Sequence, residues 1–168
     1  MADMEVQERK IVVAIDEGDE SIYALTWAIK NVVSQNSNDT VILLYAKPPL
    51  KIYSTLDGSG YLFSSDVIMS MEKYSKEVAD SVIEKAKRVC EDLQNVKVEA
   101  RIEKGDARDV ICDAVEKIGA DMLVMGTHGY GMIKRAFLGS VNTHCAQNVK
   151  CPVLIVKKPK SEVGSKSS

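Results

Sequence analysis

The sequence has no long apolar run and little net charge. None of its apolar stretches approaches the roughly 20 residues that a membrane-spanning helix needs. The acidic, polar N-terminus lacks the apolar core of a secretory signal, so we expect a cytoplasmic protein, with passive entry into the nucleus left open. A net charge of −2 over 168 residues gives the chain as a whole no attraction for nucleic acid.

Cysteine pairs and metal clusters are also missing. The four cysteines, Cys90, Cys112, Cys145 and Cys151, show no Cys-x-x-Cys spacing, and we interpret them as small buried thiols. A redox role is left open, with Cys151 as its candidate. His144 and Cys145 are adjacent on a predicted helix, where neighbours point about 100° apart, so they are poor ligands for one metal ion.

Two common nucleotide motifs are absent. No Gly-x-x-x-x-Gly-Lys-Ser/Thr loop occurs, which excludes a P-loop enzyme. The turn after the first predicted strand is acid-rich and has one glycine, Gly18, whereas a dinucleotide fingerprint places three glycines there. A carboxylate such as Asp16 in this turn would repel a pyrophosphate but could accept hydrogen bonds from ribose hydroxyls.

Short apolar runs alternate with segments of helical spacing along the chain. Strands are expected at residues 10–15, 41–46, 96–103, 122–125 and 153–156, and helices at about 21–32, 65–93, 107–118 and 140–148. The strand at 96–103 alternates apolar and charged residues, which is typical of a sheet edge. This order predicts one α/β domain with an open parallel sheet, a core at 9–157 and a flexible tail at 158–168.

A glycine-rich stretch follows the fourth predicted strand. It begins Gly126-Thr-His-Gly129 and ends at Gly139-Ser140, where a helix is expected to start. Glycines let a ligand approach the backbone, and the free N–H groups of a helix N-terminus attract phosphate. Lys134 and Arg135 add positive charge between the two glycine sites. The structural alternative is a turn followed by a helix cap, with no ligand.

The spacing Gly-x2-Gly-x9-Gly-Ser resembles the nucleotide-binding signature of the universal stress protein family, in its ATP-binding subgroup, and the resemblance covers residues 9–157. It is similar to the single-domain plant members. The resemblance implies a three-layer α/β/α, Rossmann-like fold of the adenine nucleotide alpha-hydrolase type, with strand order 3-2-1-4-5. Strands one and four are then neighbours at the point where the order reverses, so Asp16 and Gly126 should meet.

The same resemblance implies a role for each site residue. Asp16 would hold the ribose, Ala46 would offer backbone groups to the adenine edge, and Ala14 and Met125 would wall the base. The phosphate region would comprise Gly126, His128, Gly129, Gly139, Ser140 and Val141. The chain departs from the family pattern at Gly18, where a serine is expected, which puts a helix cap in doubt. The structural alternative for Asp16 is an Asx-turn or a helix cap.

These roles predict an adenine-nucleotide binder, for ATP or AMP with Mg²⁺ at the phosphates as an option, that acts as a stress-response sensor. Slow ATP hydrolysis at the same site and a nucleotide-independent, chaperone-like role remain alternatives. We expect a homodimer through the strand Val153–Val156, since that edge carries no charge before Lys157; the alternative is that the tail or a helix covers it. The stretch Pro48–Ser64 is expected either to lie over the site or to be a disordered surface loop.

Overall fold

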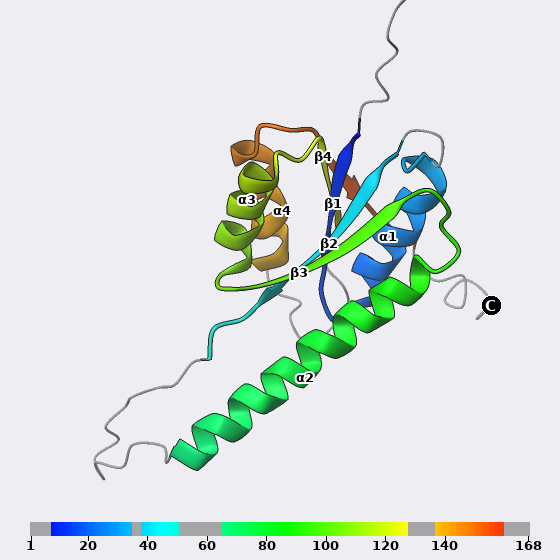
Figure 1. Cartoon of the computed structure of the whole chain (residues 1–168). Coiled ribbons are helices and arrows are strands. Elements are labelled where there is room, and N and C mark those ends of the chain that lie inside the picture. Colours follow the sequence, from blue (N-terminus) through cyan, green and yellow to red (C-terminus); the bar gives the residue numbers. More distant parts are fainter. Residues whose placement is uncertain (1–7, 35–37, 51–64, 128–136, 160–168) are drawn as a thin grey trace, which may run out of the picture.

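Five parallel strands form one sheet in the computed structural model of the chain, which describes residues 8–34, 38–50, 65–127 and 137–159 (Figure 1). The order is β3-β2-β1-β4-β5, which confirms the predicted topology. The strands are β1 (Lys10–Ile15), β2 (Thr40–Lys47), β3 (Lys97–Lys104), β4 (Met122–Gly126) and β5 (Val153–Val156).

Helices cover both faces of this sheet, as the predicted three-layer architecture requires. They are α1 (Asp19–Asn31), α2 (Ser65–Val89), α3 (Ala107–Ile118) and α4 (Phe137–Asn148). Figure 1 shows α1 and α2 on one face and α3 and α4 on the other. Each crossover from one parallel strand to the next therefore passes through a helix, and the two faces are buried in separate apolar layers.

Alternation along the central strands divides the core between these layers. Val13 and Leu43 point to the layer under α1 and α2, whereas Val12 and Leu44 point to the layer under α3 and α4. All four side chains are almost completely buried. Continuous β-branched and aliphatic runs are thus required in β1 and β2, because neither face of these strands meets water.

The β3 strand lies at one edge of the sheet, as its alternating sequence predicts. Every residue of β3 except Val98 is exposed, and its charged side chains discourage pairing with another edge. The β5 strand forms the other edge.

Three helices differ from their predicted bounds, and the first is α1, which spans Asp19–Asn31 where about 21–32 was predicted. The α2 helix ends at Val89 and not at residue 93, because the chain tightens there into i→i−3 hydrogen bonds such as Leu93 N to Cys90 O. The α4 helix begins at Phe137, three residues before the predicted start at Ser140. Gly139 argues against helix by propensity, but glycine is cheaper in a first turn, whose N–H groups have no intrahelical partner.

The caps of α3 follow the sequence closely. Asp106 is its N-cap, and the carboxylate accepts a hydrogen bond from Arg108 N. Gly119 is the C-cap and ends the helix in the left-handed conformation at φ 69°, which glycine adopts without strain. Among the described helices, none is long and apolar enough to cross a membrane.

An ion pair between Arg9 and the buried Asp39 links the segments just before β1 and β2, at the ends of these strands away from the candidate site. Asp39 is completely buried just before β2 and accepts hydrogen bonds from Arg9 Nη2 at 2.6 Å, Arg9 Nε at 3.0 Å and Ser34 N at 2.7 Å. Arg9 Nη2 also donates to Val32 O, at the end of α1. Burial disfavours the charged carboxylate, but the hydrogen bonds and the Arg9 charge outweigh it and lower the pKa of Asp39.

We expect Arg9→Gln to lower the free energy of unfolding by about 2–3 kcal/mol at neutral pH, because it leaves the buried Asp39 carboxylate without a counter-charge. A carboxyl with a depressed folded pKa stabilises the fold above its unfolded pKa, near 4, and loses that contribution as pH falls through the folded value. The deficit of the variant should therefore shrink at acidic pH.

Chemical denaturation between pH 3 and pH 7 measures this difference. Arg108→Gln is the matched control, since it removes an equivalent but exposed pair with Asp106 and should leave the transition nearly unchanged. Equal effects of the two substitutions would contradict the importance given to the buried pair.

Candidate functional site

The candidate site lies where the strand order reverses. The β1 strand pairs with β2 on one side and β4 on the other, and its register with β4 runs from Ile11 opposite Met122 to Val13 opposite Val124. The carboxyl ends of β1 and β4 therefore open at the same edge of the sheet. Open α/β sheets bind their ligands in the crevice at this point.

A cavity of about 120 Å³ occupies this crevice. Six of the ten predicted site residues line it, and the structure thus brings together Ala14, Asp16, Ala46, Met125, Gly126 and Val141. The other lining residues are Ile15, Ser21, Leu44, Ala107, Ile111, Thr127 and Asn142. Ligand pockets usually measure about 300–1,000 Å³, so a whole nucleotide would extend beyond this cavity.

The lining combines apolar walls with a few polar groups on one side. Leu44, Ile111 and Met125 are buried members of the layer under α3 and α4, and Val141 packs against that layer. Asp16, Ser21, Thr127 and Asn142 supply the polar groups. An apolar slot with a small number of oriented polar groups is typical of a site for a flat, partly polar ligand.

Asp16 is exposed directly after β1 and holds the turn into α1. Its Oδ1 accepts a hydrogen bond from Gly18 N at 2.8 Å, which is an Asx-turn, so the structural alternative for this residue is realised. The turn uses Oδ1, and in the part of the chain that the structure describes Oδ2 has no partner. Gly18 is the N-cap of α1 without a side-chain hydrogen bond, as its replacement of the family serine suggests.

Ser21 completes this turn, although the sequence predicts only that a helix begins near this residue. Its hydroxyl is buried, accepts from Asp16 N at 3.0 Å and lies 3.2 Å from Asp16 O and 3.1 Å from Gly18 O. The hydroxyl therefore fixes both backbone groups of Asp16. The signal in the sequence is a serine five residues after the aspartate, at the first turn of a helix.

Gly126 ends β4 at a position where no side chain fits. A Cβ built there would lie 2.6 Å from Glu20 O and 2.8 Å from Glu20 C, both in the first turn of α1. On the opposite side, Asn142 Nδ2 donates to Gly126 O at 3.2 Å. The packing of β4 against α1 therefore requires a glycine at position 126, whether or not a ligand binds. Asn142 is a second cavity residue that the sequence did not predict.

The α4 helix lines the same crevice directly after its N-terminal turn. Val141 and Asn142 line the cavity, and the first four N–H groups of the helix are those of residues 137–140, which include Gly139 and Ser140. Such groups attract anions. The predicted loop residues His128 and Gly129 lie outside the described residues, as do Lys134 and Arg135 and the side chains of residues 137–140.

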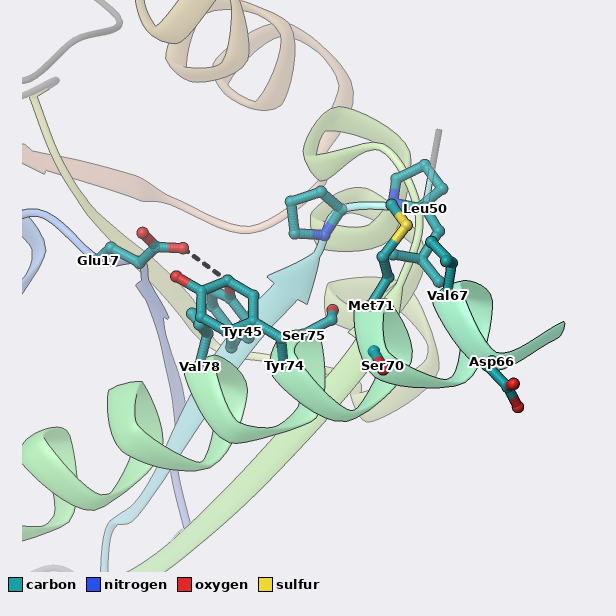
Figure 2. Close-up of a pocket in the computed structure, with 12 residues that line it drawn as sticks. Glu17, Tyr45, Leu50, Asp66, Val67, Ser70, Met71, Tyr74, Ser75 and Val78 are labelled. Atoms are coloured by element: carbon teal, nitrogen blue, oxygen red, sulfur yellow. Dashed lines mark hydrogen bonds between the residues drawn. The ribbon is translucent and has the colours of Figure 1, made fainter. Parts of the chain in front are cut away.

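A larger cavity, of about 600 Å³, lies on the other face of β2 (Figure 2). Tyr45 points into it, whereas its neighbour Ala46 points into the crevice described above. The Tyr45 hydroxyl donates to Glu17 Oε1 at 3.3 Å, and burial together with that carboxylate raises the pKa of Tyr45 to about 12. Glu17 and Asp66 are the only charged groups among its described lining residues, so this cavity repels phosphate.

The part of the chain described here contains no group of three or more side chains suited to a metal ion. His144 contacts Asn148 through Nδ1 on α4 instead.

An open parallel sheet with helices on both faces and a crevice at its reversal point defines a doubly wound α/β fold. The model of the universal stress protein family matches residues 8–157, nearly the whole chain, and the chain belongs to this family.

Relatives in plants and solved structures agree with this membership. The chain is 29% identical over 142 residues to a universal stress protein A-like protein of Arabidopsis thaliana, covering 84% of this chain and 81% of the relative. A universal stress protein family protein from Arabidopsis thaliana, solved with AMP bound, superposes with a TM-score of 0.65 at 23% identity, over 94% of this chain and 97% of that one. A universal stress protein in complex with cAMP gives 0.61 at 23% identity, over 89% and 97%.

We expect Gly126→Ala to lower the free energy of unfolding by about 2–3 kcal/mol, because the methyl group forces β4 away from the backbone of Glu20. Thermal unfolding followed by circular dichroism measures the loss. Gly18→Ala is the control, because its Cβ would meet only side-chain tips, Asp16 Oδ1 at 3.2 Å and Glu20 Oε2 at 3.7 Å, and Gly18 has an ordinary extended conformation. A Gly126 variant as stable as the Gly18 variant would show that β4 and α1 can separate freely.

Proposed function

We propose that this chain binds an adenine nucleotide, AMP or ATP, in the crevice between β1 and β4, and serves as a binding and sensing module in a stress response. The observation that carries the proposal is the meeting of three features at one cavity: apolar walls, the carboxylate of Asp16 and the N-terminal turn of α4. Family relatives solved with AMP and with cAMP support an adenine ligand.

Each part of the nucleotide has a chemical counterpart in the site. The adenine ring would lie between Ala14 and Met125, with the backbone of Ala46 at its edge. The ribose hydroxyls would donate to Asp16 Oδ2, since Oδ1 accepts from Gly18 N. The phosphates would lie toward Gly126, His128, Gly129, Gly139, Ser140 and Val141, where glycine backbone and helical N–H groups suit an anion. Mg²⁺ could accompany ATP at the phosphates.

Binding is favoured over hydrolysis by the supply of carboxylates. Asp16 is the one acidic side chain among the described residues that line the cavity, and the ribose would occupy it. Phosphoryl transfer to water needs a group that positions the water, and usually a metal ion, at the terminal phosphate. The proposed activity is therefore a binding equilibrium.

Asp16→Ala should weaken AMP binding by about 1.5–3 kcal/mol, or about 10- to 150-fold in Kd, because ribose hydroxyls lose a charged acceptor. Isothermal titration calorimetry measures the affinity. An AMP analogue without the 2′ and 3′ hydroxyls tests the same contact from the ligand side. The analogue should bind the parent protein more weakly than AMP does, whereas the Asp16→Ala variant should bind the analogue and AMP with equal affinity.

The neighbouring substitution Asp19→Ala is the control, since Asp19 lies in the same acidic turn but outside the lining of the cavity. It should leave the affinity for AMP unchanged. A parent protein that gives no heat with either AMP or ATP and magnesium would refute nucleotide binding altogether.

We further propose that the chain forms a homodimer through β5. The β5 strand pairs with β4 on one side only and lies at the sheet edge. Its burial is incomplete, with Val153 and Leu154 partly exposed and Ile155 41% exposed. A second β5 added antiparallel across a two-fold axis would satisfy the unpaired backbone groups and cover these side chains.

Ile155→Lys should shift the protein from dimer to monomer in sedimentation velocity, because a charge would be buried at the centre of the paired edges. Ile102→Lys is a matched control on the opposite edge, where Ile102 is also 41% exposed. The control should remain a dimer. A parent that sediments as a monomer at tens of micromolar, or a control that dissociates equally, would contradict a dimer through β5.

A further inference from the structure

Two cysteine thiols meet between the helices that wall the crevice. Cys112 Sγ on α3 lies 3.9 Å from Cys145 Sγ on α4, although the two residues are 33 positions apart in the chain. Both are free thiols, with Cys145 completely buried and Cys112 partly exposed. Cys151, the candidate from the sequence, lines a cavity with Cys112, but the recorded thiol contact is with Cys145.

The positions of the two thiols relate them to the candidate site. Cys112 directly follows Ile111, and Cys145 lies one helical turn after Val141; Ile111 and Val141 both line the crevice. The chain between the two cysteines contains β4 and the start of α4. A covalent bond between the sulfurs would thus clamp α3 to α4 beside the cavity and close a loop around the strand that ends at Gly126.

We propose that Cys112 and Cys145 form an oxidisable dithiol whose conversion to a disulfide clamps α3 to α4 and narrows the crevice. Hydrogen peroxide transfers one oxygen to the Cys112 sulfur, which becomes a sulfenic acid as one water is released. The Cys145 sulfur then attacks the Cys112 sulfur, the S–S bond forms, and hydroxide leaves and takes the Cys145 proton as a second water. The thiols lose two electrons and two hydrogens, and the peroxide is reduced.

The environment of the pair sets when this reaction occurs. Burial raises the pKa of both thiols, that of Cys145 to about 12, so each is protonated at neutral pH and poorly reactive. The pair therefore stays reduced without an added oxidant. Once the partly exposed Cys112 is oxidised, the Cys145 sulfur, 3.9 Å away, is in position to attack it. A disulfide shortens the distance between the two sulfurs from 3.9 Å to about 2.05 Å, and we expect this to draw the two helices together.

Mass spectrometry of the intact chain after hydrogen peroxide tests the bond. We expect an intramolecular loss of two hydrogens, a linked Cys112–Cys145 peptide, and a melting temperature raised by about 5–10 °C that dithiothreitol reverses. Cys112→Ala and Cys145→Ala should each abolish the link, whereas Cys90→Ala and Cys151→Ala should retain it. A link from Cys112 to Cys151, or unlinked and over-oxidised thiols, would overturn the assignment.

The effect on the crevice rests on the proposed function and is measured separately. Calorimetry with AMP should show about fivefold or greater loss of affinity in the oxidised protein, restored by dithiothreitol and absent in Cys145→Ala. Equal affinity in both redox states would overturn the narrowing of the crevice while the cross-link stands. A reduced protein that fails to bind AMP would refute nucleotide binding instead, and with it this coupling, but not the dithiol.

Discussion

The shape of the crevice depends on the close approach of the β4 backbone to the first turn of α1. Gly126 lies so near Glu20 that a single added carbon would be 2.6 Å from its carbonyl oxygen. This approach fixes the end of β4 against the turn that carries Asp16 and Ser21, on neighbouring strands of the sheet. The crevice has its shape because these two carboxyl ends cannot move apart without loss of packing. Gly126, which the family resemblance assigns to the phosphate region, is thus required by the packing of the fold as well.

Charge around the crevice is unevenly distributed, and under the proposed function this distribution would orient a bound nucleotide. The turn from β1 into α1 carries Asp16, Glu17, Asp19 and Glu20, which repel phosphate. The opposite wall begins α4, whose N-terminal N–H groups attract it. An adenine nucleotide in this crevice would therefore turn its hydroxyls toward Asp16 and its phosphates toward α4. The reverse orientation would place the phosphates beside the carboxylate of Asp16. The described residues that line the crevice include no cation that could separate these negative charges.

The sequence patterns predicted the alternation of buried strands and helices, whereas the strand order, and with it the meeting of Asp16 and Gly126 at one crevice, was implied by the family resemblance. Buried strands appear as continuous apolar runs, and the resemblance to a known family supplied the crossover of β1 and β4. Ser21 and Asn142 escaped because their roles are hydrogen bonds to backbone atoms 5 and 16 positions away, which only the folded chain brings close. The start of α4 was predicted too late because the Gly139-Ser140 pair was taken to mark the helix N-terminus, whereas Gly139 lies inside the first turn of the helix.

The packing of α3 against α4 joins the crevice to the thiol pair. A ligand between Ile111 and Val141 would hold the two helices at their present separation, whereas a bond between Cys112 and Cys145 needs the sulfurs nearer than 3.9 Å. The two events would therefore oppose one another across a single interface. Coupling between sites is reciprocal: if oxidation weakens nucleotide binding, bound nucleotide must by the same factor disfavour the disulfide. Under this coupling, the chain that has lost its nucleotide is the one that an oxidant modifies most readily.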